Sequence, residues 1–228
     1  MAKIFNLFFI QPVKNKEYIP ALGYDVLTPF YDTVARLTTR EKSFKTALVK
    51  QAKVEAGQRV LDLACGSATL AILLKTAAPK AEITGVDGDP RILEIAREKT
   101  RKDDLEIQFD EAMSFALPYA DAFFDKAVSS LFFHHLTREN KLKTLREVFR
   151  VLKPQGEFHI ADWGLPANLL MGISSKFIQL LDGFETTGDN FRGRLPDLIK
   201  RAGFENVEET NRFNTVFGTI RLLRSRKI

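Results

Sequence analysis

Carboxylates and small residues in the first half of the chain are spaced as a nucleoside-binding site would require. Asp62 opens a turn between an apolar run and a helical segment, and Asp87 follows about 25 residues later. That spacing is close to the one at which an acid receives ribose hydroxyls in nucleotide-binding βαβ units. Small residues in the turn would let the backbone approach a ligand, with amides near a helix N-terminus: Ala64, Cys65 and Gly66.

The carboxylate of Asp62 discriminates between the ligands that such a turn could take. A pyrophosphate would be repelled by an acid in the same turn, whereas the ammonium group of S-adenosylmethionine would be attracted, directly or through water. The turn also lacks the full G-x-G-x-x-G pattern, because Ala64 and Ala68 stand at positions where glycines would be expected. The turn therefore favours S-adenosylmethionine over a dinucleotide. The alternative role of Asp62 is to bind loop amides and hold the turn.

Other residues are candidates for the rest of this cofactor site: Gly88, Ala112, Met113, Ser130 and Tyr31. Met113 follows a third apolar run, close to Asp110 and Ser114, where an adenine ring could be flanked, although a methionine is more often part of a core. Tyr31 lies in an N-terminal helical stretch and, with Tyr24, could close over the cofactor.

Two adjacent histidines are the candidates for acid–base chemistry. His134 and His135 follow the fourth predicted strand, on the edge of the sheet where ligands bind. Methyl transfer needs mainly alignment and desolvation, but where the nucleophile must lose a proton, a histidine is a natural acceptor. The alternative for each is a packing role at the start of a helix. Adjacent side chains diverge, and no Cys/His cluster has zinc-ligand spacing, so we expect no metal.

Residues around the ends of the fourth and fifth predicted strands indicate an apolar acceptor pocket. We expect Phe132, Asp162 and Trp163 to contact the acceptor. The following helical stretch could wall the pocket through its apolar side chains Leu169, Leu170, Met171, Phe177 and Phe184. The chain has 19 phenylalanines, and many must be core; those near the site favour an aromatic, quinone-like or lipid-like acceptor.

Short apolar strands alternate with longer helical segments along the chain. Strands are predicted at 59–63, 82–87, 105–110, 126–132 and 157–163, with a turn at 153–156 and two closing strands near 207–213 and 216–223. Helices are predicted at about 68–77, 89–101, 137–152, 165–184 and 195–202, several with capping residues at their starts. This order predicts a mainly parallel sheet with helices on both faces. Residues 1–54 form an N-terminal helical cap or lid, and residues 55–228 form the catalytic domain.

Composition limits the classes of protein to which the chain can belong. Its 228 residues suit one compact unit, and the single cysteine excludes an internal disulfide framework, which fits a cytoplasmic location. The net charge is +5 for residues 1–60, −5 for 61–190 and +5 for 191–228. The acidic middle argues against a nucleic-acid track, whereas the basic termini could touch anionic lipid. The apolar run at 4–10 is too short to span a membrane.

Four sequence blocks in order resemble the class I S-adenosylmethionine-dependent methyltransferases, nearest to the ubiquinone/menaquinone C-methyltransferase-like group: VLDLACGSATLAILL, ITGVDGDPRILEIAREK, LPYADAFFDKAVSSLFFHHL and LREVFRVLKPQGEFHIADW. The resemblance implies a Rossmann-like seven-stranded sheet whose last strand inserts antiparallel. It also implies that Asp62, Ala64 and Gly66 line the methionine end of the cofactor, that Asp87 holds the ribose, and that the segment near Met113 meets the adenine. The expected product is S-adenosylhomocysteine.

Three other functions fit parts of this pattern. An NAD-type oxidoreductase could use the same sheet, although Asp62 and the missing glycines disfavour it. A non-catalytic methyltransferase-like binding module would keep the cofactor residues without turnover. An RNA methyltransferase is disfavoured by the modest charge. The sequence leaves open the identity of the acceptor, the choice between carbon, oxygen and nitrogen methylation, and the oligomeric state.

Overall fold

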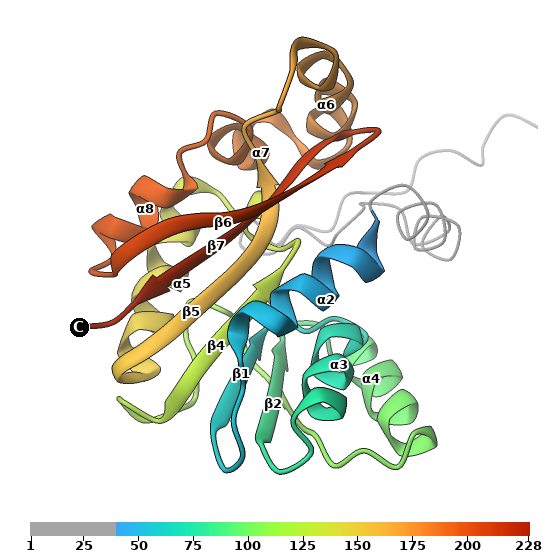
Figure 1. The fold of residues 1–228 in the computed structure, drawn as a ribbon, viewed down its shortest axis with the longest axis vertical. Helices are drawn as coiled ribbons and strands as arrows, with labels where there is room; N and C mark the ends of the chain where they lie inside the picture. The colour runs from blue at the N-terminus through green and yellow to red at the C-terminus, as the bar shows by residue number, and fades with distance from the viewer. Residues whose placement is uncertain (1–39) are drawn as a thin grey trace, which may run out of the picture.

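A seven-stranded sheet runs through the whole of the described chain (Figure 1). The structure is a computed structural model that describes residues 40–228. Its strands are β1 (Arg59–Leu63), β2 (Glu82–Asp87), β3 (Gln108–Glu111), β4 (Phe124–Ser130), β5 (Leu152–Gly164), β6 (Glu205–Thr215) and β7 (Gly218–Arg226). Their order across the sheet is β3-β2-β1-β4-β5-β7-β6. The first five strands are parallel, and β7 inserts between β5 and β6, antiparallel to both, which confirms the predicted fold class.

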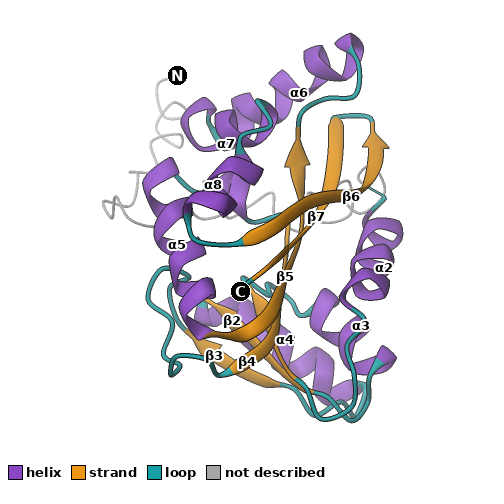
Figure 2. Cartoon of the chain, turned by 60° about the vertical axis from the view of Figure 1, so that its left-hand side comes forward, coloured by secondary structure: helices purple, strands orange, loops and turns teal. Residues whose placement is uncertain are grey.

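Helices cover both faces of this sheet (Figure 2). They are α2 (Glu41–Ala52), α3 (Thr69–Ala77), α4 (Pro90–Lys102), the short 3-10 helix η1 (Phe133–His135), α5 (Arg138–Val151), α6 (Leu169–Asp182), α7 (Phe184–Phe191) and α8 (Leu195–Arg201). The apolar residues of α2, α3 and α4 fill one core, and those of α5 and α8 fill a second. The strands between these layers are buried on both sides, as expected for parallel strands.

Local sequence explains where several helices begin. Asp89 accepts a hydrogen bond from the Arg91 amide at 2.9 Å, and Pro90 occupies the first position of α4. Thr137 accepts from the Asn140 amide at 3.3 Å at the start of α5. Both starts were predicted from the cap residues.

Some predicted boundaries were wrong for physical reasons. The predicted turn at 153–156 belongs to β5, because the Gln155 amide donates to the Lys227 carbonyl at 2.7 Å and the Lys227 amide to the Gly156 carbonyl at 2.9 Å. The pairing with the end of the chain thus extends the strand. The single helix predicted at 165–184 is two helices, separated by Gly183 with φ of 90°.

The basic C-terminal residues lie in or next to β7 and contact other parts of the chain. Arg224 pairs with Glu208, Arg226 with Glu157 at 2.8 Å, and Arg221 with Glu209. The ammonium of Lys227 donates to main-chain carbonyls, including that of Leu152 at 2.7 Å. Much of the positive charge of this tail is therefore balanced within the sheet.

The proposed N-terminal cap lies only partly within the described residues. Its last helix, α2, packs on the sheet through Phe44, Leu48 and Ala52. Tyr24 and Tyr31 lie outside the described residues, and a cap that ends at residue 54 stays a prediction. In the described part of the chain, no helix is long and apolar enough to cross a membrane.

Candidate active site

The carboxyl ends of the parallel strands meet at one edge of the sheet. There, β1 has β2 on one side and β4 on the other, so the strand order reverses between β1 and β4. Such a switch point is where open α/β sheets bind ligands. The predicted residues at the ends of β1, β2, β3, β4 and β5 are therefore gathered at this edge.

The turn after β1 holds left-handed backbone at three alternate positions. The φ angles are 55° at Ala64, 53° at Gly66 and 63° at Ala68. Glycine adopts this conformation freely, but an alanine there carries strain of about 1–2 kcal/mol. Strain of this kind concentrates at ligand-binding turns, and it explains why glycines were expected at Ala64 and Ala68.

Asp62 ends up buried beneath this turn with one carboxylate oxygen unsatisfied. The residue is 1% exposed, and its Oδ2 has no hydrogen-bond partner within the described residues. Burial raises the pKa of Asp62 to about 7, against the opposing charge of Lys45 and a hydrogen bond from the Ala71 amide. A buried acceptor without a partner requires an explanation, and a ligand cation at this position would supply one.

Asp87 joins the end of β2 to the turn after β1. Its Oδ2 accepts from the Gly66 amide at 3.0 Å, and its Oδ1 accepts from the Asp89 amide at 3.1 Å. Burial raises the pKa of Asp87, against these backbone hydrogen bonds. Each carboxylate oxygen has two lone pairs, so these contacts leave capacity for ribose hydroxyls.

The segment after β3 lies against Gly88. The Ala112 amide donates to the Asp87 carbonyl at 3.1 Å, and a Cβ placed on Gly88 would come within 2.9 Å of the Met113 sulfur. A larger residue at this position would require the Met113 side chain to shift. The structure thus brings Gly88, Ala112 and Met113 together beside Asp87, where an adenosyl group would extend from its ribose.

The thiol of Cys65 faces the core rather than the edge of the sheet. Cys65 is 8% exposed, and its sulfur would lie 2.9 Å from a Cβ on Gly85. Burial raises the pKa of this thiol. Its predicted cofactor contact is therefore restricted to its backbone.

A buried carboxylate organises the turn after β4. Asp162 is 2% exposed; its Oδ2 accepts from the amides of Phe132 at 3.1 Å and Phe133 at 2.7 Å. Its Oδ1 accepts from the Trp163 amide at 2.7 Å and lies 2.7 Å from Nδ1 of His134. These four partners occupy the carboxylate of Asp162, and its predicted contact with the acceptor stays a prediction.

Trp163 also faces inward. It is 4% exposed and stacks on Phe191 with ring centroids 6.0 Å apart. It packs in the core, and its predicted contact with the acceptor stays a prediction. Phe132 is half-buried beside Phe133 and stays a candidate, as does Ser130 at the end of β4. Leu169 and Leu170 are 82% and 78% exposed, so they do not wall a pocket.

The two histidines differ in their surroundings. His134 is 3% exposed and held by Asp162. The ring of His135 lies 3.9 Å from that of His134, and burial, with the charges of His134 and Lys141, lowers the pKa of His135 well below its usual value. His135 is therefore neutral at physiological pH.

Lys141 connects this turn to α7, a contact that no sequence pattern indicated. Its side chain is fully buried; the ammonium donates to the carbonyls of Leu136 at 2.9 Å and Thr186 at 2.5 Å. Burial lowers the pKa of Lys141 to about 8, against the attraction of Asp189 and Asp162. In the sequence Lys141 resembles any solvated helical lysine.

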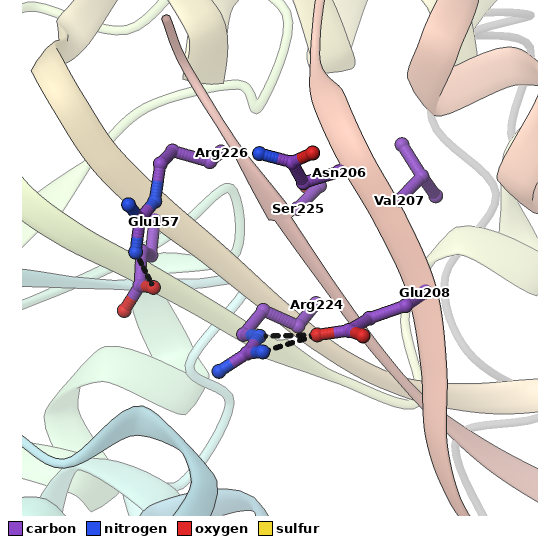
Figure 3. Close-up of a pocket in the computed structure, with 7 residues that line it drawn as sticks. All are labelled: Glu157, Asn206, Val207, Glu208, Arg224, Ser225 and Arg226. Atoms are coloured by element: carbon purple, nitrogen blue, oxygen red, sulfur yellow. Dashed lines mark hydrogen bonds and ion pairs between the residues drawn. The ribbon is translucent and has the colours of Figure 1, made fainter.

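A polar cavity of about 390 Å³ lies at the opposite end of the sheet (Figure 3). It is lined by Glu157, Asn206, Val207, Glu208, Arg224, Ser225 and Arg226. Glu157 lies near the amino end of β5, away from the edge that carries Asp62. Both arginines in it are paired with glutamates, so we do not assign this cavity to the candidate site.

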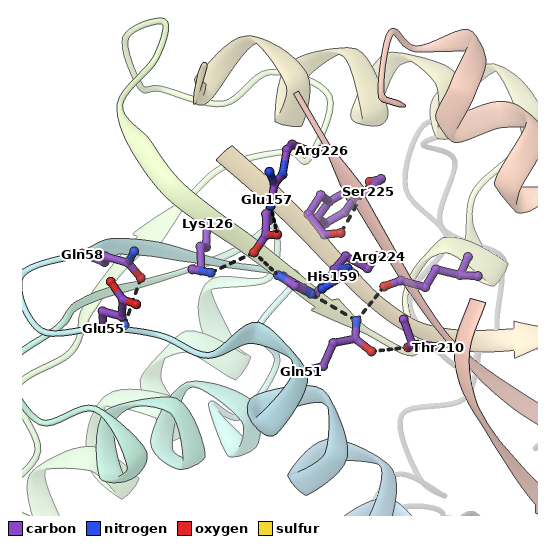
Figure 4. Close-up of polar contacts among 12 residues, drawn as sticks. Gln51, Glu55, Gln58, Lys126, Glu157, His159, Thr210, Arg224, Ser225 and Arg226 are labelled. Carbon is purple, nitrogen blue, oxygen red and sulfur yellow. Dashed lines mark hydrogen bonds and ion pairs between the residues drawn. The ribbon is translucent and has the colours of Figure 1, made fainter. Parts of the chain in front are cut away.

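His159 belongs to a structural network beside this cavity (Figure 4). Its Nδ1 lies 3.1 Å from Nε2 of Gln51 on α2, and its Nε2 lies 3.5 Å from Glu157. Glu157 also binds Lys126 at 2.9 Å. These contacts give His159 a structural role. The described residues contain no cluster of three or more His, Cys, Asp or Glu that could hold a metal.

Comparison with known proteins shows what the chain is similar to. A family model described as a methyltransferase domain matches residues 60–156. Demethylmenaquinone methyltransferases are 34% identical over 148 residues in Deinococcus radiodurans and 36% identical over 150 residues in Thermus thermophilus. These alignments cover 64% and 66% of this chain but only 61% and 65% of the relatives, so the chain spans less than two thirds of their length.

Two further proteins match over more of their length. The ubiquinone/menaquinone biosynthesis C-methyltransferase of Syntrophotalea carbinolica is 28% identical over 217 residues, covering 89% of this chain and 90% of that protein. The crystal structure of a putative methyltransferase from Bacillus halodurans has the same fold, with a TM-score of 0.66 and 19% identity over 81% of this chain and 99% of that one. The chain thus contains a region that matches a methyltransferase domain, and it is similar along most of its length to ubiquinone/menaquinone C-methyltransferases.

Proposed function

We propose that this chain transfers a methyl group from S-adenosylmethionine to a small, quinone-like acceptor. The observation that carries the proposal is the unsatisfied Oδ2 of the buried Asp62, at the switch point of a methyltransferase sheet. An ammonium group is the ligand that a carboxylate in that position would bind best. A pyrophosphate would be repelled there, which disfavours NAD.

Each cofactor residue has a role that its surroundings support. Asp62 binds the ammonium, and the charge of Lys45 favours the ionised form of Asp62 that this contact needs. Asp87 accepts from the ribose hydroxyls. Gly88, Ala112 and Met113 flank the adenine, while the backbone of the turn from Ala64 to Gly66 lines the methionine chain. Ser130, at the end of β4, lies near the methionine end of the cofactor. Tyr31, which is outside the described residues, would close over the cofactor.

The chain's own contribution to catalysis is alignment, exclusion of water and the handling of one proton. S-adenosylmethionine, when bound, supplies an electrophilic methyl group on a sulfonium. We assign to His135 the role of accepting a proton at a ring nitrogen from an acidic acceptor hydroxyl, because it lies in the turn after β4 at this edge of the sheet. His134 is positioned by its contact with Asp162 and fixes the turn that carries His135.

The class of acceptor follows from the relatives and from the apolar surroundings of the turn. Two of the relatives described above are demethylmenaquinone methyltransferases. The half-buried Phe132 offers an aromatic face for a flat ring. Action in the cytoplasm belongs to the same proposal, whereas the basic C-terminal residues are paired within the sheet and are not assigned a membrane contact.

A transfer assay tests the proposal directly. The purified chain is incubated with S-adenosylmethionine carrying a labelled methyl group and a reduced, unmethylated naphthoquinone, with the Asp62→Asn variant as the negative control. Label in the naphthoquinone with the wild type alone supports the function. Tight cofactor binding without transfer to any quinone, phenol or lipid acceptor would instead favour a non-catalytic binding module.

A further inference from the structure

Helix α6 exposes several large apolar side chains to solvent. Leu169 is 82% exposed, Leu170 78%, Ile173 61% and Leu180 70%. Ser175, a polar residue on the opposite face, is 1% exposed. A surface helix in water buries its apolar face and exposes its polar face. The outward face of α6 therefore requires an apolar environment that the described part of the chain does not supply.

The exposed apolar residues of α6 form one continuous stripe. Leu169, Ile173, Lys176 and Leu180 are spaced by four, three and four residues, which places them on a single face of the helix. We call these four residues the α6 stripe. Other exposed apolar side chains lie in the same part of the chain or on the hairpin that contacts α6: Leu165 at 49%, Leu170 at 78%, Phe184 at 58% and Val216 at 67%.

The position of α6 in the fold allows this face to meet a flat surface. Helix α6 and the tip of the β6–β7 hairpin lie together at one end of the molecule, beyond the sheet (Figures 1 and 2). The two elements are joined by a contact between the Thr219 hydroxyl and the Met171 sulfur at 3.6 Å. From this end, α7 leads directly to η1 and the candidate acceptor site.

The charges around the stripe are those of a helix that rests on anionic headgroups. The α6 stripe contains one charged residue, the exposed Lys176, and no acid. Arg192, just after α7, is also exposed, whereas Arg194 lies 3.9 Å from Asp189 and the exposed Glu185 is the acid at the start of α7. A long lysine side chain can lie along apolar surface and place its ammonium among phosphates. A second protein copy would instead need a broad complementary surface, which a single protruding helix does not provide.

We propose that the α6 stripe docks this protein onto an anionic lipid bilayer, beside the entrance for its acceptor. The inference rests on the proposed function, since a lipid-like quinone would be dissolved in that bilayer. The helix lies in the plane of the interface with its leucines among the acyl chains. The acceptor then reaches the edge that carries His135 without crossing water.

Sedimentation with vesicles tests the docking surface without any need for activity. The wild type is mixed with vesicles of phosphatidylcholine alone and of phosphatidylcholine with phosphatidylglycerol, beside the triple variant Leu169→Gln, Ile173→Gln, Leu180→Gln. The matched control is Ile95→Gln, which removes a 52% exposed isoleucine from α4. We expect the triple variant to bind mixed vesicles about tenfold or more weakly, Lys176→Glu to lose the preference for anionic lipid, and the control to bind as wild type.

Three results would overturn the proposal. These are equal binding by the wild type and the triple variant, a concentration-dependent dimer that the triple variant abolishes, or a lower unfolding temperature of the triple variant with unchanged vesicle binding. Loss of a dimer in the triple variant would mean that the α6 stripe contacts a second copy of the chain. A lower unfolding temperature with unchanged vesicle binding would mean that the stripe packs on another part of this chain. Titration with S-adenosylmethionine in parallel separates the two proposals, because intact cofactor binding without vesicle binding would remove the docking surface alone.

Discussion

At the scale of single residues, Asp62 is held in a state that favours ligand binding at the expense of stability. Its pKa of about 7 lies above the ordinary value of 3.8, because burial disfavours the charge. The folded state therefore holds the proton more tightly than the unfolded state does. The stabilisation due to Asp62 is complete below pH 4 and is lost as pH rises towards 7.

We expect Asp62→Asn to raise the free energy of unfolding at pH 8 by about 1–3 kcal/mol, because the variant buries no charge. The gain should be much smaller at pH 5, where Asp62 is already protonated in the folded protein. Urea unfolding at both pH values measures this, with the exposed Glu106→Gln as the control. A variant that is less stable than the wild type at both pH values would contradict the burial cost.

The carboxyl group of Asp62 also predicts how the affinity for S-adenosylmethionine depends on pH. An ammonium pairs with the ionised form of Asp62, so affinity should rise by up to about tenfold from pH 6 to pH 7 and then level off above pH 8. Titrations in buffers of different ionisation enthalpy should show a proton released on binding at pH 6. Flat affinity between pH 6 and pH 8 would mean that Asp62 does not meet the ammonium.

Substitutions in the histidine turn, at His135 and at the Asp162 that holds His134, should lower turnover and leave the affinity for the cofactor nearly unchanged. We expect His135→Ala to lower kcat by about 100-fold or more, the usual contribution of a general base. Asp162→Asn should have a smaller effect, because it disturbs the turn through His134 and touches no substrate. Steady-state kinetics and cofactor titration of both variants test these roles. If His135→Ala turns over as fast as the wild type, no proton passes through this residue.

At the scale of elements, backbone strain in the turn after β1 can be measured by exchanging alanine and glycine. Ala64→Gly should raise the free energy of unfolding by about 0.5–1 kcal/mol, because it relieves a left-handed alanine in a half-buried position. Ala68→Gly should change little, since the same relief is offset by loss of a fully buried methyl group. Gly66→Ala should cost about 1–2 kcal/mol, although its Cβ would meet open space. Similar stability of all three variants would show that the turn is not strained.

The elements that were predicted well are those whose determinants are local. The apolar run at 59–63 and the cap at Asp89 carry their own signals, and β1 and α4 follow them. The start of β5 depends on Lys227, more than 70 residues away, which no local pattern reveals. The interruption between α6 and α7 depends on one glycine in an otherwise continuous apolar pattern.

At the scale of the whole molecule, sequence spacing predicted which residues gather at the edge of the sheet but not which way their side chains point. Asp62, Asp87 and Met113 meet as expected, because each follows a parallel strand. Asp162 and Trp163 reach the same edge but turn inward, and that direction is set by the packing of η1 and α7. The influences of Lys45 on Asp62 and of Lys141 on α7 arise only when distant helices pack together.

Calorimetric titration of the wild type with S-adenosylmethionine, S-adenosylhomocysteine and NAD, side by side, is the most direct test of the proposed function. The carboxylates at Asp62 and Asp87 predict micromolar binding of the first two, on the order of 8 kcal/mol of binding free energy, and none of NAD. Binding of NAD without binding of S-adenosylmethionine would contradict the assignment of Asp62 and favour a dinucleotide enzyme. Binding of none of the three would mean that this edge of the sheet no longer binds a cofactor.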